Sequence, residues 1–102
     1  MKKNDRVFAG IRATGRQHIG NYLGAIQNFV KLQDRYECIY SIVDLHSLTT
    51  LTDTQDLKKN VHETALDLLS AGIDPDRTIL YVQSHVPQVS ELHVLLGMVV
   101  PN

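Results

Sequence analysis

The chain has 102 residues, 43% of them hydrophobic, and a formal net charge of −1, values that fit one small globular domain. This charge balance excludes a broadly basic nucleic-acid-binding face but allows a partner bound by a local cluster of charge. The longest apolar run, Leu95–Val100, is too short to cross a bilayer. The single cysteine, Cys38, has no partner for an internal disulfide, so we expect a reduced, cytoplasmic protein without a membrane partner.

The first half of the chain predicts two strands with a helix between them. The run Val7–Ala13 is apolar and β-prone, and glycine-rich sequence follows it. From Ile19 onward, apolar residues recur at three- and four-residue steps, which predicts an amphipathic helix of roughly four turns. The run Glu37–Asp44 is apolar on both parities, as in a strand of a parallel sheet that is buried on both faces.

A second helix is expected after the polar segment that follows this strand. Thr52 and Gln55 have the spacing of a capping box, with Thr52 as the N-cap. Apolar residues at 57, 61, 65, 68 and 69 fall on one helical face. Gly72 then stands where a helix commonly stops.

The remaining sequence predicts a third strand and a third helix. The strand is expected at Thr78–Gln83, and Pro87 is expected to close the loop after it. Ser90 is a possible cap for a helix that begins at Leu92 and runs to Val100. The order β-α-β-α-β-α predicts an α/β fold, a Rossmann-like parallel sheet with flanking helices.

The glycine-rich segment after the first strand raises the question of phosphate binding. A helix N-terminus attracts anions, and glycine lets a phosphate approach the backbone closely. The glycines at 10, 15, 20 and 24 are spaced too widely for the dinucleotide fingerprint G-x-G-x-x-G. They fit the glycine spacing of a P-loop, but the lysine and the hydroxyl residue that complete that loop are missing. Gly24 has a second interpretation, close packing of the helix on a strand.

Five blocks of the sequence resemble the tryptophanyl-tRNA synthetase family of class I aminoacyl-tRNA synthetases, in the same order. The tetrapeptide HIGN looks like the HIGH signature of that class, with Asn21 in place of the final histidine. The blocks are FAGIRATG (Phe8–Gly15), HIGNYLGA (His18–Ala25), IVDLHSLT (Ile42–Thr49), AGIDP (Ala71–Pro75) and QSHVPQVSEL (Gln83–Leu92).

The resemblance implies an enzyme that activates L-tryptophan with ATP and Mg²⁺ and transfers it to tRNA(Trp). The implied ATP-binding residues are Arg12, Ala13, Thr14, Gly20 and Asn21. His18 and Asn21 are the implied catalytic residues, donating hydrogen bonds to phosphate oxygens in the transition state. Many family members have Gln-Pro where this chain has Arg12-Ala13.

Tryptophan recognition is implied for residues from the first two strands and the turn after the second. The family's pocket wall matches Phe8, Gly10, Val43 and His46, and an aromatic and aliphatic wall suits an indole. Asp44 has two interpretations, a ligand contact or a structural cap for the following turn. The histidines and the cysteine do not have metal-ligand spacing, so no protein metal site is expected.

The resemblance also implies a division of the family protein that this chain covers only in part. Residues 1–102 match the N-terminal part of the ATP-binding Rossmann catalytic domain. The C-terminal half, the KMSKS-like loop and the anticodon-binding domain have no counterpart in these residues, so we expect the chain to be the first portion of a longer, homodimeric ligase. The alternatives are a nucleotide-binding fragment without catalysis, a tyrosyl-tRNA synthetase-like relative, and an interaction fragment that pairs through its sheet edge and apolar C-terminal segment.

Overall fold

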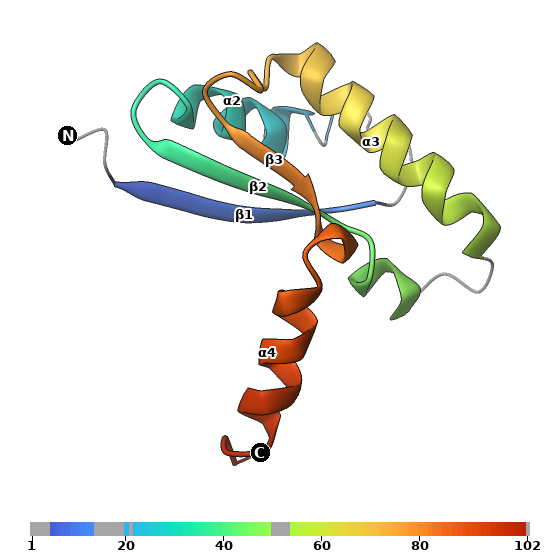
Figure 1. Cartoon of the computed structure of the whole chain (residues 1–102). Coiled ribbons are helices and arrows are strands. Elements are labelled where there is room, and N and C mark those ends of the chain that lie inside the picture. The colour runs from blue at the N-terminus through green and yellow to red at the C-terminus, as the bar shows by residue number, and fades with distance from the viewer. Residues whose placement is uncertain (1–4, 14–19, 21, 50–53, 102) are drawn as a thin grey trace.

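The computed structural model describes residues 5–13, 20, 22–49 and 54–101. Within them, three strands form one parallel sheet in the order β1-β2-β3 (Figure 1). The strands are β1 (Arg6–Arg12), β2 (Glu37–Val43) and β3 (Ile79–Val82). Sequential strands that pair in parallel, with a helical segment between each two, confirm the expected α/β, Rossmann-like class.

The helical segment between β1 and β2 is not a uniform α-helix. A π-helical turn η1 (Tyr22–Ile26) precedes the short helix α2 (Gln27–Leu32). The sequence predicts one continuous amphipathic helix over this region. The wider turn contains Gly24, which weakens the α-helical preference locally, and single π-type turns are frequent near functional sites.

Helix α3 (Leu57–Ala71) ends where the sequence predicts. Gly72 has a φ of 119°, and the N–H groups of Gly72 and Ile73 donate to the carbonyl oxygens of Leu69 and Leu68 at 3.2 and 3.1 Å. Glycine adopts this left-handed conformation without a Cβ clash. At the other end, a short 3-10 turn η3 (Thr54–Asp56) leads into the helix, and the predicted capping residue Thr52 lies outside the described residues.

The last helix begins five residues earlier than the sequence predicts. After the 3-10 turn η4 (Gln83–His85), helix α4 spans Pro87–Gly97, so Pro87 opens the helix and Ser90 lies inside it. Proline is favoured in the first helical turn, because the N–H that it lacks has no partner there. The prediction that Pro87 closes the loop and that the helix starts at Leu92 was therefore wrong.

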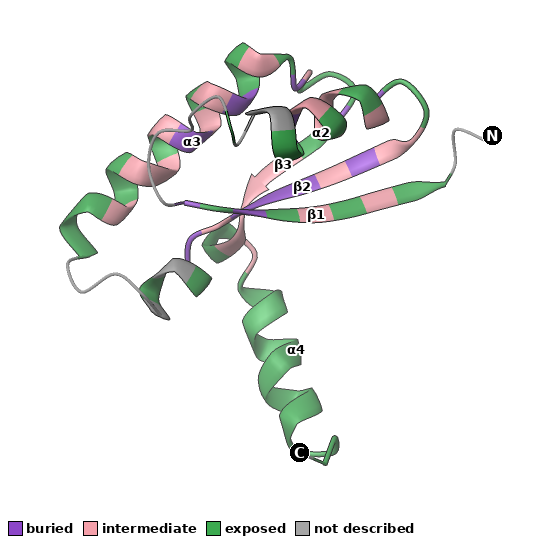
Figure 2. Ribbon diagram, turned by 180° about the vertical axis from the view of Figure 1, so that it is seen from behind, coloured by how far each residue is buried: buried purple, intermediate pink, exposed green. Residues whose placement is uncertain are grey.

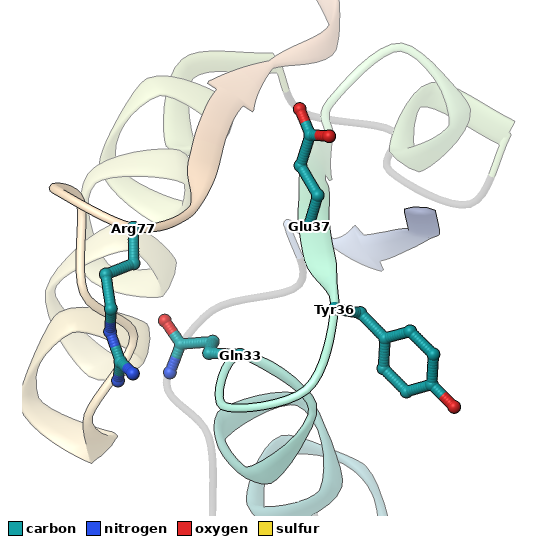
Figure 3. Close-up of a pocket in the computed structure, with 4 residues that line it drawn as sticks. All are labelled: Gln33, Tyr36, Glu37 and Arg77. Atoms are coloured by element: carbon teal, nitrogen blue, oxygen red, sulfur yellow. The ribbon is translucent and has the colours of Figure 1, made fainter. Parts of the chain in front are cut away.

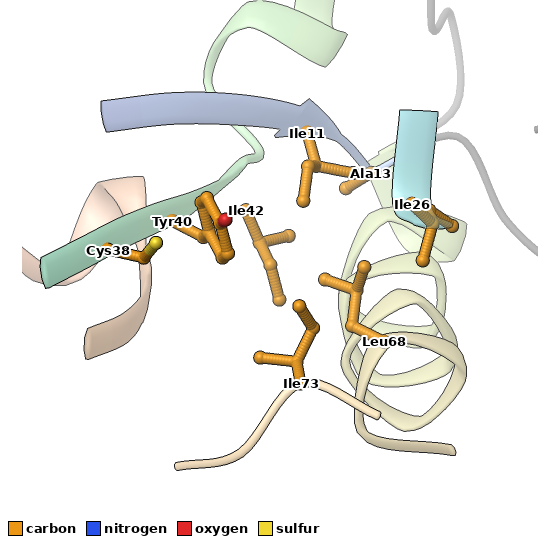
Figure 4. Packing of buried hydrophobic residues seen from close by; sticks show 8 residues of the cluster. All are labelled: Ile11, Ala13, Ile26, Cys38, Tyr40, Ile42, Leu68 and Ile73. Atoms are coloured by element: carbon orange, nitrogen blue, oxygen red, sulfur yellow. The ribbon is translucent and has the colours of Figure 1, made fainter. Parts of the chain in front are cut away.

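The hydrophobic core lies on one side of the sheet, between the strands and the segments η1, α2 and α3 (Figures 1 and 4). Its buried residues are Ile11, Ala13, Ile26, Cys38, Tyr40, Ile42, Leu68 and Ile73. The strand residues of this set alternate along β1 and β2, as expected for one face of a pleated sheet.

The other face of the sheet is less covered. Residues of β2 on this face are half-buried, except for buried Ser41, and Phe8 of β1 is 66% exposed. The prediction that β2 is buried on both faces therefore holds fully for one face only. Helix α4 leaves the carboxyl end of the sheet and is exposed along its whole length (Figure 2). This arrangement leaves the open face and the carboxyl edge available for a site.

Candidate functional site

The candidate site lies where the open face meets the carboxyl edge of the sheet. Parallel α/β sheets bind ligands at the carboxyl ends of their strands, because the connecting segments there can diverge around a ligand. In this chain the segments after β1, β2 and β3 begin at Ala13, Asp44 and Gln83. Most of the residues singled out from the sequence fall on these segments or on the last residues of the strands before them.

The predicted tryptophan-wall residues of β1 and β2 share the open face. In the register, Phe8 is opposite Ile39, Gly10 is opposite Ser41 and Arg12 is opposite Val43. Paired residues of a parallel ladder point to the same side, and all of these lie on the parity opposite to the core. The structure therefore brings Phe8, Gly10 and Val43 to one surface.

Gly10 and Val43 are in tight contact on this surface. A Cβ placed on Gly10 would lie 2.8 Å from Cγ2 of Val43, a distance that real Cβ atoms essentially never show. Glycine is thus needed here for close approach rather than for a special φ angle. Gly24 differs, because a Cβ placed on it would meet no atom within 4 Å, so close helix–strand packing does not explain it.

Arg12 and Ala13 occupy very different surroundings although they are neighbours in sequence. Arg12 is exposed at the end of β1, on the same parity as Phe8 and Gly10. Ala13 is fully buried in the core, with 0% exposure, and its N–H donates to the carbonyl oxygen of Val43 at 3.5 Å. The burial of Ala13 favours a role in shaping the end of the strand over direct contact with a nucleotide.

His46 lies just beyond the end of β2, in the 3-10 turn η2 (His46–Thr49), and is exposed. Gly20 is also exposed and helical. Thr14, His18 and Asn21 lie outside the described residues. The structure thus places Phe8, Gly10 and Val43 on one face of the sheet and His46 in the turn that follows β2.

Asp44 has the structural role that the sequence left open. Its carboxylate is buried, with the residue 7% exposed, and Oδ1 accepts from the N–H of Leu45 at 2.9 Å and from the N–H of Ser84 at 3.0 Å. The hydroxyl of Ser84 donates to Oδ2. Asp44 therefore joins the end of β2 to η4, which follows β3.

Gln83, beside this contact, has a buried side-chain oxygen, Oε1, without a hydrogen-bond partner among the described residues. Buried polar atoms are usually paired, so this acceptor is a notable feature of the carboxyl edge. Sequence reasoning placed Gln83 in a family block but gave its side chain no role.

A separate cavity of about 240 Å³ lies at the opposite, amino edge of the sheet (Figure 3). It is lined by Gln33, Tyr36, Glu37 and Arg77. The guanidinium of Arg77 forms ion pairs with Asp34 and Asp74, and the hydrogen bond that it donates to Asp34 is the main reason that the pKa of Arg77 is raised. The charges of Arg77, Asp34 and Asp74 are already paired with one another, and the cavity lies at the end of the sheet opposite to the carboxyl ends of the strands. This cavity is therefore not the candidate site.

Two negative findings apply to the part of the chain that the structure describes. No group of three or more His, Cys, Asp or Glu side chains there is placed to hold a metal ion. No described helix combines the length and apolar character needed to span a membrane.

Comparison with known proteins adds to this geometry. A family model described as "tRNA synthetases class I (W and Y)" matches residues 1–102. The tryptophan–tRNA ligase of Aquifex aeolicus is 43% identical over 98 residues, which are 95% of this chain and 25% of that protein. The corresponding ligase of Rhodopirellula baltica is 50% identical over 91 residues, which are 89% of this chain and 28% of that protein. The chain thus spans between a quarter and three-tenths of the length of these relatives.

Solved structures that resemble this chain are also tRNA synthetases for tryptophan or tyrosine. The tryptophanyl-tRNA synthetase of Campylobacter jejuni, complexed with ADP and tryptophan, has a TM-score of 0.89 and 38% identity over 94% of this chain and 30% of its own. The tyrosyl-tRNA synthetase of Archaeoglobus fulgidus, complexed with L-tyrosine, has a TM-score of 0.78 at 20% identity over 98% of this chain and 33% of its own. The second likeness, at this identity, shows the shared fold.

Proposed function

Because the chain belongs to the class I tRNA synthetases for tryptophan and tyrosine, we propose that it is the N-terminal part of the ATP-binding catalytic domain of a tryptophan–tRNA ligase. Relatives named tryptophan–tRNA ligase, at 43% and 50% identity, support tryptophan over tyrosine as the substrate. Below, the complete protein means this chain together with the further sequence that such relatives carry.

The proposed reaction has two steps. The carboxylate of tryptophan attacks the α-phosphorus of ATP, a P–O bond to the β-phosphate breaks, and pyrophosphate leaves with tryptophanyl-adenylate remaining. A hydroxyl of the terminal ribose of tRNA(Trp) then attacks the acyl carbon of the adenylate, the bond from that carbon to the phosphate oxygen breaks, and AMP leaves. Such displacements depend on positioning and on stabilisation of charge on the phosphate oxygens. A relative solved with ADP and tryptophan supports both small substrates.

The observation that carries this proposal is the open face shared by Phe8, Gly10 and Val43, on which Gly10 and Val43 lie toward the carboxyl edge. An exposed aromatic ring on the same face as an aliphatic side chain and a glycine suits the flat indole of tryptophan. Arg12 lies on the same face, and a permanent cation suits the phosphates of ATP. His46, in the turn after β2, would face the tryptophan rather than the ATP.

The nucleotide would lie along the segment between β1 and η1. Thr14, Gly20 and Asn21 would contact ATP, and His18 and Asn21 would donate to its phosphate oxygens during adenylate formation. Ala13 would act through the shape of the loop.

Mg²⁺ would neutralise charge on the polyphosphate when bound, and the described residues fit a metal carried chiefly by phosphate oxygens and water, because no carboxylate cluster is among them. The complete protein would act on tRNA(Trp) as a homodimer in the cytoplasm.

Pyrophosphate exchange into ATP tests the proposal in the complete protein. We expect exchange that depends on L-tryptophan, with L-tyrosine in parallel reactions giving little. Exchange that depends on tyrosine would identify a tyrosine enzyme, and binding of ATP without any exchange would identify a nucleotide-binding module. We expect the 102-residue chain alone not to charge tRNA, because the resemblance assigns a second set of phosphate contacts to later sequence.

The role of His18 has its own test. We expect His18→Ala in the complete protein to lower the rate of adenylate formation much more than the affinity for tryptophan, because the imidazole would act on charge that develops in the transition state. Phe8→Ala should do the reverse and raise KM for tryptophan with little change in KM for ATP. Equal losses of rate and tryptophan affinity in His18→Ala would remove histidine from the catalytic role.

A further inference from the structure

The buried carboxylate of Asp44 is the main polar link between the ends of β2 and β3 in the described structure. Three donors reach it, namely the N–H groups of Leu45 and Ser84 and the hydroxyl of Ser84. Burying a carboxylate is costly unless charge-assisted hydrogen bonds compensate, and here they do. Forty positions separate Asp44 from Ser84 in the sequence, so this link depends on the fold.

This link begins where the strand ladder stops. The β2–β3 pairing runs from Ile39 opposite Ile79 to Ile42 opposite Val82. Beyond Ile42, where the ladder pairs end, the carboxylate of Asp44 accepts from the N–H of Ser84 and so holds η4 against the end of β2. This bond therefore joins the two strand ends beyond the last ladder pair, next to the candidate site.

Val43 is fixed from the opposite side by β1. Its carbonyl oxygen accepts from the N–H of Ala13 at 3.5 Å, and its Cγ2 packs directly over Gly10. Asp44 also accepts from the N–H of Leu45, and the N–H of Leu48 donates to Leu45 O at 3.1 Å, which starts the turn that carries His46. The proposed wall residues Val43 and His46 thus lie on either side of Asp44, with Val43 bonded to the residue after β1 and Asp44 bonded to Ser84 in the turn after β3.

We propose that Asp44 and Ser84 form a positioning pair that sets Val43 and His46 for contact with the amino-acid substrate. Neither residue of the pair needs to touch the substrate. The buried carboxylate of Asp44 and its donors define one arrangement of the strand ends, whereas an apolar contact at the same place would allow several arrangements. This inference rests on the proposed function, since it concerns the same site.

The test compares Ser84→Ala with Ser84→Thr in the complete protein by tryptophan-dependent pyrophosphate exchange. We expect Ser84→Ala to raise KM for tryptophan about tenfold, because misplacing a contact residue weakens a positioned substrate strongly. KM for ATP should change less than about twofold, since the nucleotide would lie against the segment after β1. Ser84→Thr keeps the hydroxyl and should retain most of the tryptophan affinity.

Ser90→Ala, the same change at an exposed position on α4, is the matched control and should leave both KM values as they are. Thermal unfolding of each variant checks the fold, and Asp44→Asn, which keeps the shape and one acceptor oxygen, replaces Ser84→Ala if that variant does not fold. Unchanged KM for tryptophan in Ser84→Ala, with exchange intact, overturns the positioning role alone. Absence of tryptophan-dependent exchange in the unsubstituted protein overturns the proposed function and the positioning role with it.

Discussion

At the scale of single residues, Gln33 joins more separate parts of the fold than any sequence pattern suggests. The residue is 2% exposed, and its Nε2 donates to the carbonyl oxygens of Val30 and Gly72, each at 3.0 Å. Its Oε1 accepts from the N–H of Asp74 and the hydroxyl of Thr78, each at 2.7 Å. Both donors and both acceptor sites of the amide are therefore used, and one side chain links the ends of α2 and α3 to the start of β3.

Gln33→Leu should destabilise the chain by about 3 kcal/mol, because it removes the partner of the Gly72 carbonyl, the Asp74 N–H and the Thr78 hydroxyl, in hydrogen bonds that are part-buried or buried. Urea unfolding followed by circular dichroism measures this loss. Gln27→Leu, at a half-buried position at the start of the same helix, is the control and should cost less than about 1 kcal/mol. A loss for Gln33→Leu as small as that of the control would contradict the assigned link.

Gly10→Ala tests the close contact on the open face. The added methyl would meet Cγ2 of Val43, so we expect a loss of about 1–3 kcal/mol in the free energy of unfolding and, in the complete protein, weaker tryptophan binding. Gly24→Ala is the matched glycine variant, and it should stabilise the chain by up to about 1 kcal/mol, since its Cβ has free space in a helical segment. Equal stability effects at the two positions would show that the contact with Val43 is not tight.

At the scale of elements, the packing of helix α2 against strand β2 depends on Tyr40. Its hydroxyl donates to the carbonyl oxygen of Phe29 at 2.7 Å, and the two rings lie 5.0 Å apart between centroids with a tilt of 41°. The residue is fully buried, and this burial, together with a hydrogen bond to Cys38, raises the pKa of the phenol well above its ordinary value. The helix and the strand are therefore held by a group that must stay neutral.

The raised pKa of Tyr40 predicts how stability depends on alkaline pH. Below the unfolded pKa of about 10 the phenol is protonated in both states, and its contribution to stability is fully present. Above that pH the unfolded chain releases the proton first, so stability falls as pH rises toward the folded pKa. Tyr40→Phe should lack this part of the decline, although it loses about 1 kcal/mol at neutral pH. Urea unfolding between neutral and alkaline pH measures both effects.

Tyr81→Phe is the control for this experiment, because Tyr81 lies on the open face and Tyr40 is retained in that variant. Its stability should decline above pH 10 as steeply as that of the unsubstituted chain. A parallel decline in Tyr40→Phe and the unsubstituted chain would show that Tyr40 does not titrate with a raised pKa.

At the scale of the whole molecule, helix α4 extends the structure beyond a compact shape. The radius of gyration is 14.9 Å, against about 13 Å for a compact domain of this length. The helix carries a dense group of exposed apolar side chains, such as Leu92 at 55% and Leu95 at 60% exposure. Exposed apolar surface of this kind promotes association between molecules.

We therefore expect the 102-residue chain to associate as its concentration rises, and the double substitution Leu92→Glu with Leu95→Glu to reduce this association strongly. Sedimentation velocity over a wide range of concentrations measures the effect. Leu66→Glu is the control, since Leu66 is 50% exposed on α3, away from α4. Association that responds equally to Leu66→Glu, or not at all to the α4 substitutions, would rule out α4 as the associating surface.

The sequence by itself determined the α/β class, the order of its elements, the helix stop at Gly72 and the family. Each of these depends on local signals, namely the period of apolar residues, a glycine at a helix end, and short motifs in a fixed order. The candidate strand residues also came from motifs, and the structure places Phe8, Gly10 and Val43 on one face. The expected single helix after β1 was replaced by η1 and α2, and Pro87 opened α4 where a loop was expected.

Only the tertiary structure decided which face of the sheet is open, why Gly10 needs to be glycine, and how Gln33 and Asp44 hold the fold. These features depend on contacts between residues far apart in the sequence, 39 positions from Gln33 to Gly72 and 40 from Asp44 to Ser84. A local pattern records the polarity of a side chain and its period, but the partner of a buried polar group is chosen by the packing of distant elements. For that reason the sequence could propose the residues of a site, and the structure was needed to show what holds the described ones in place.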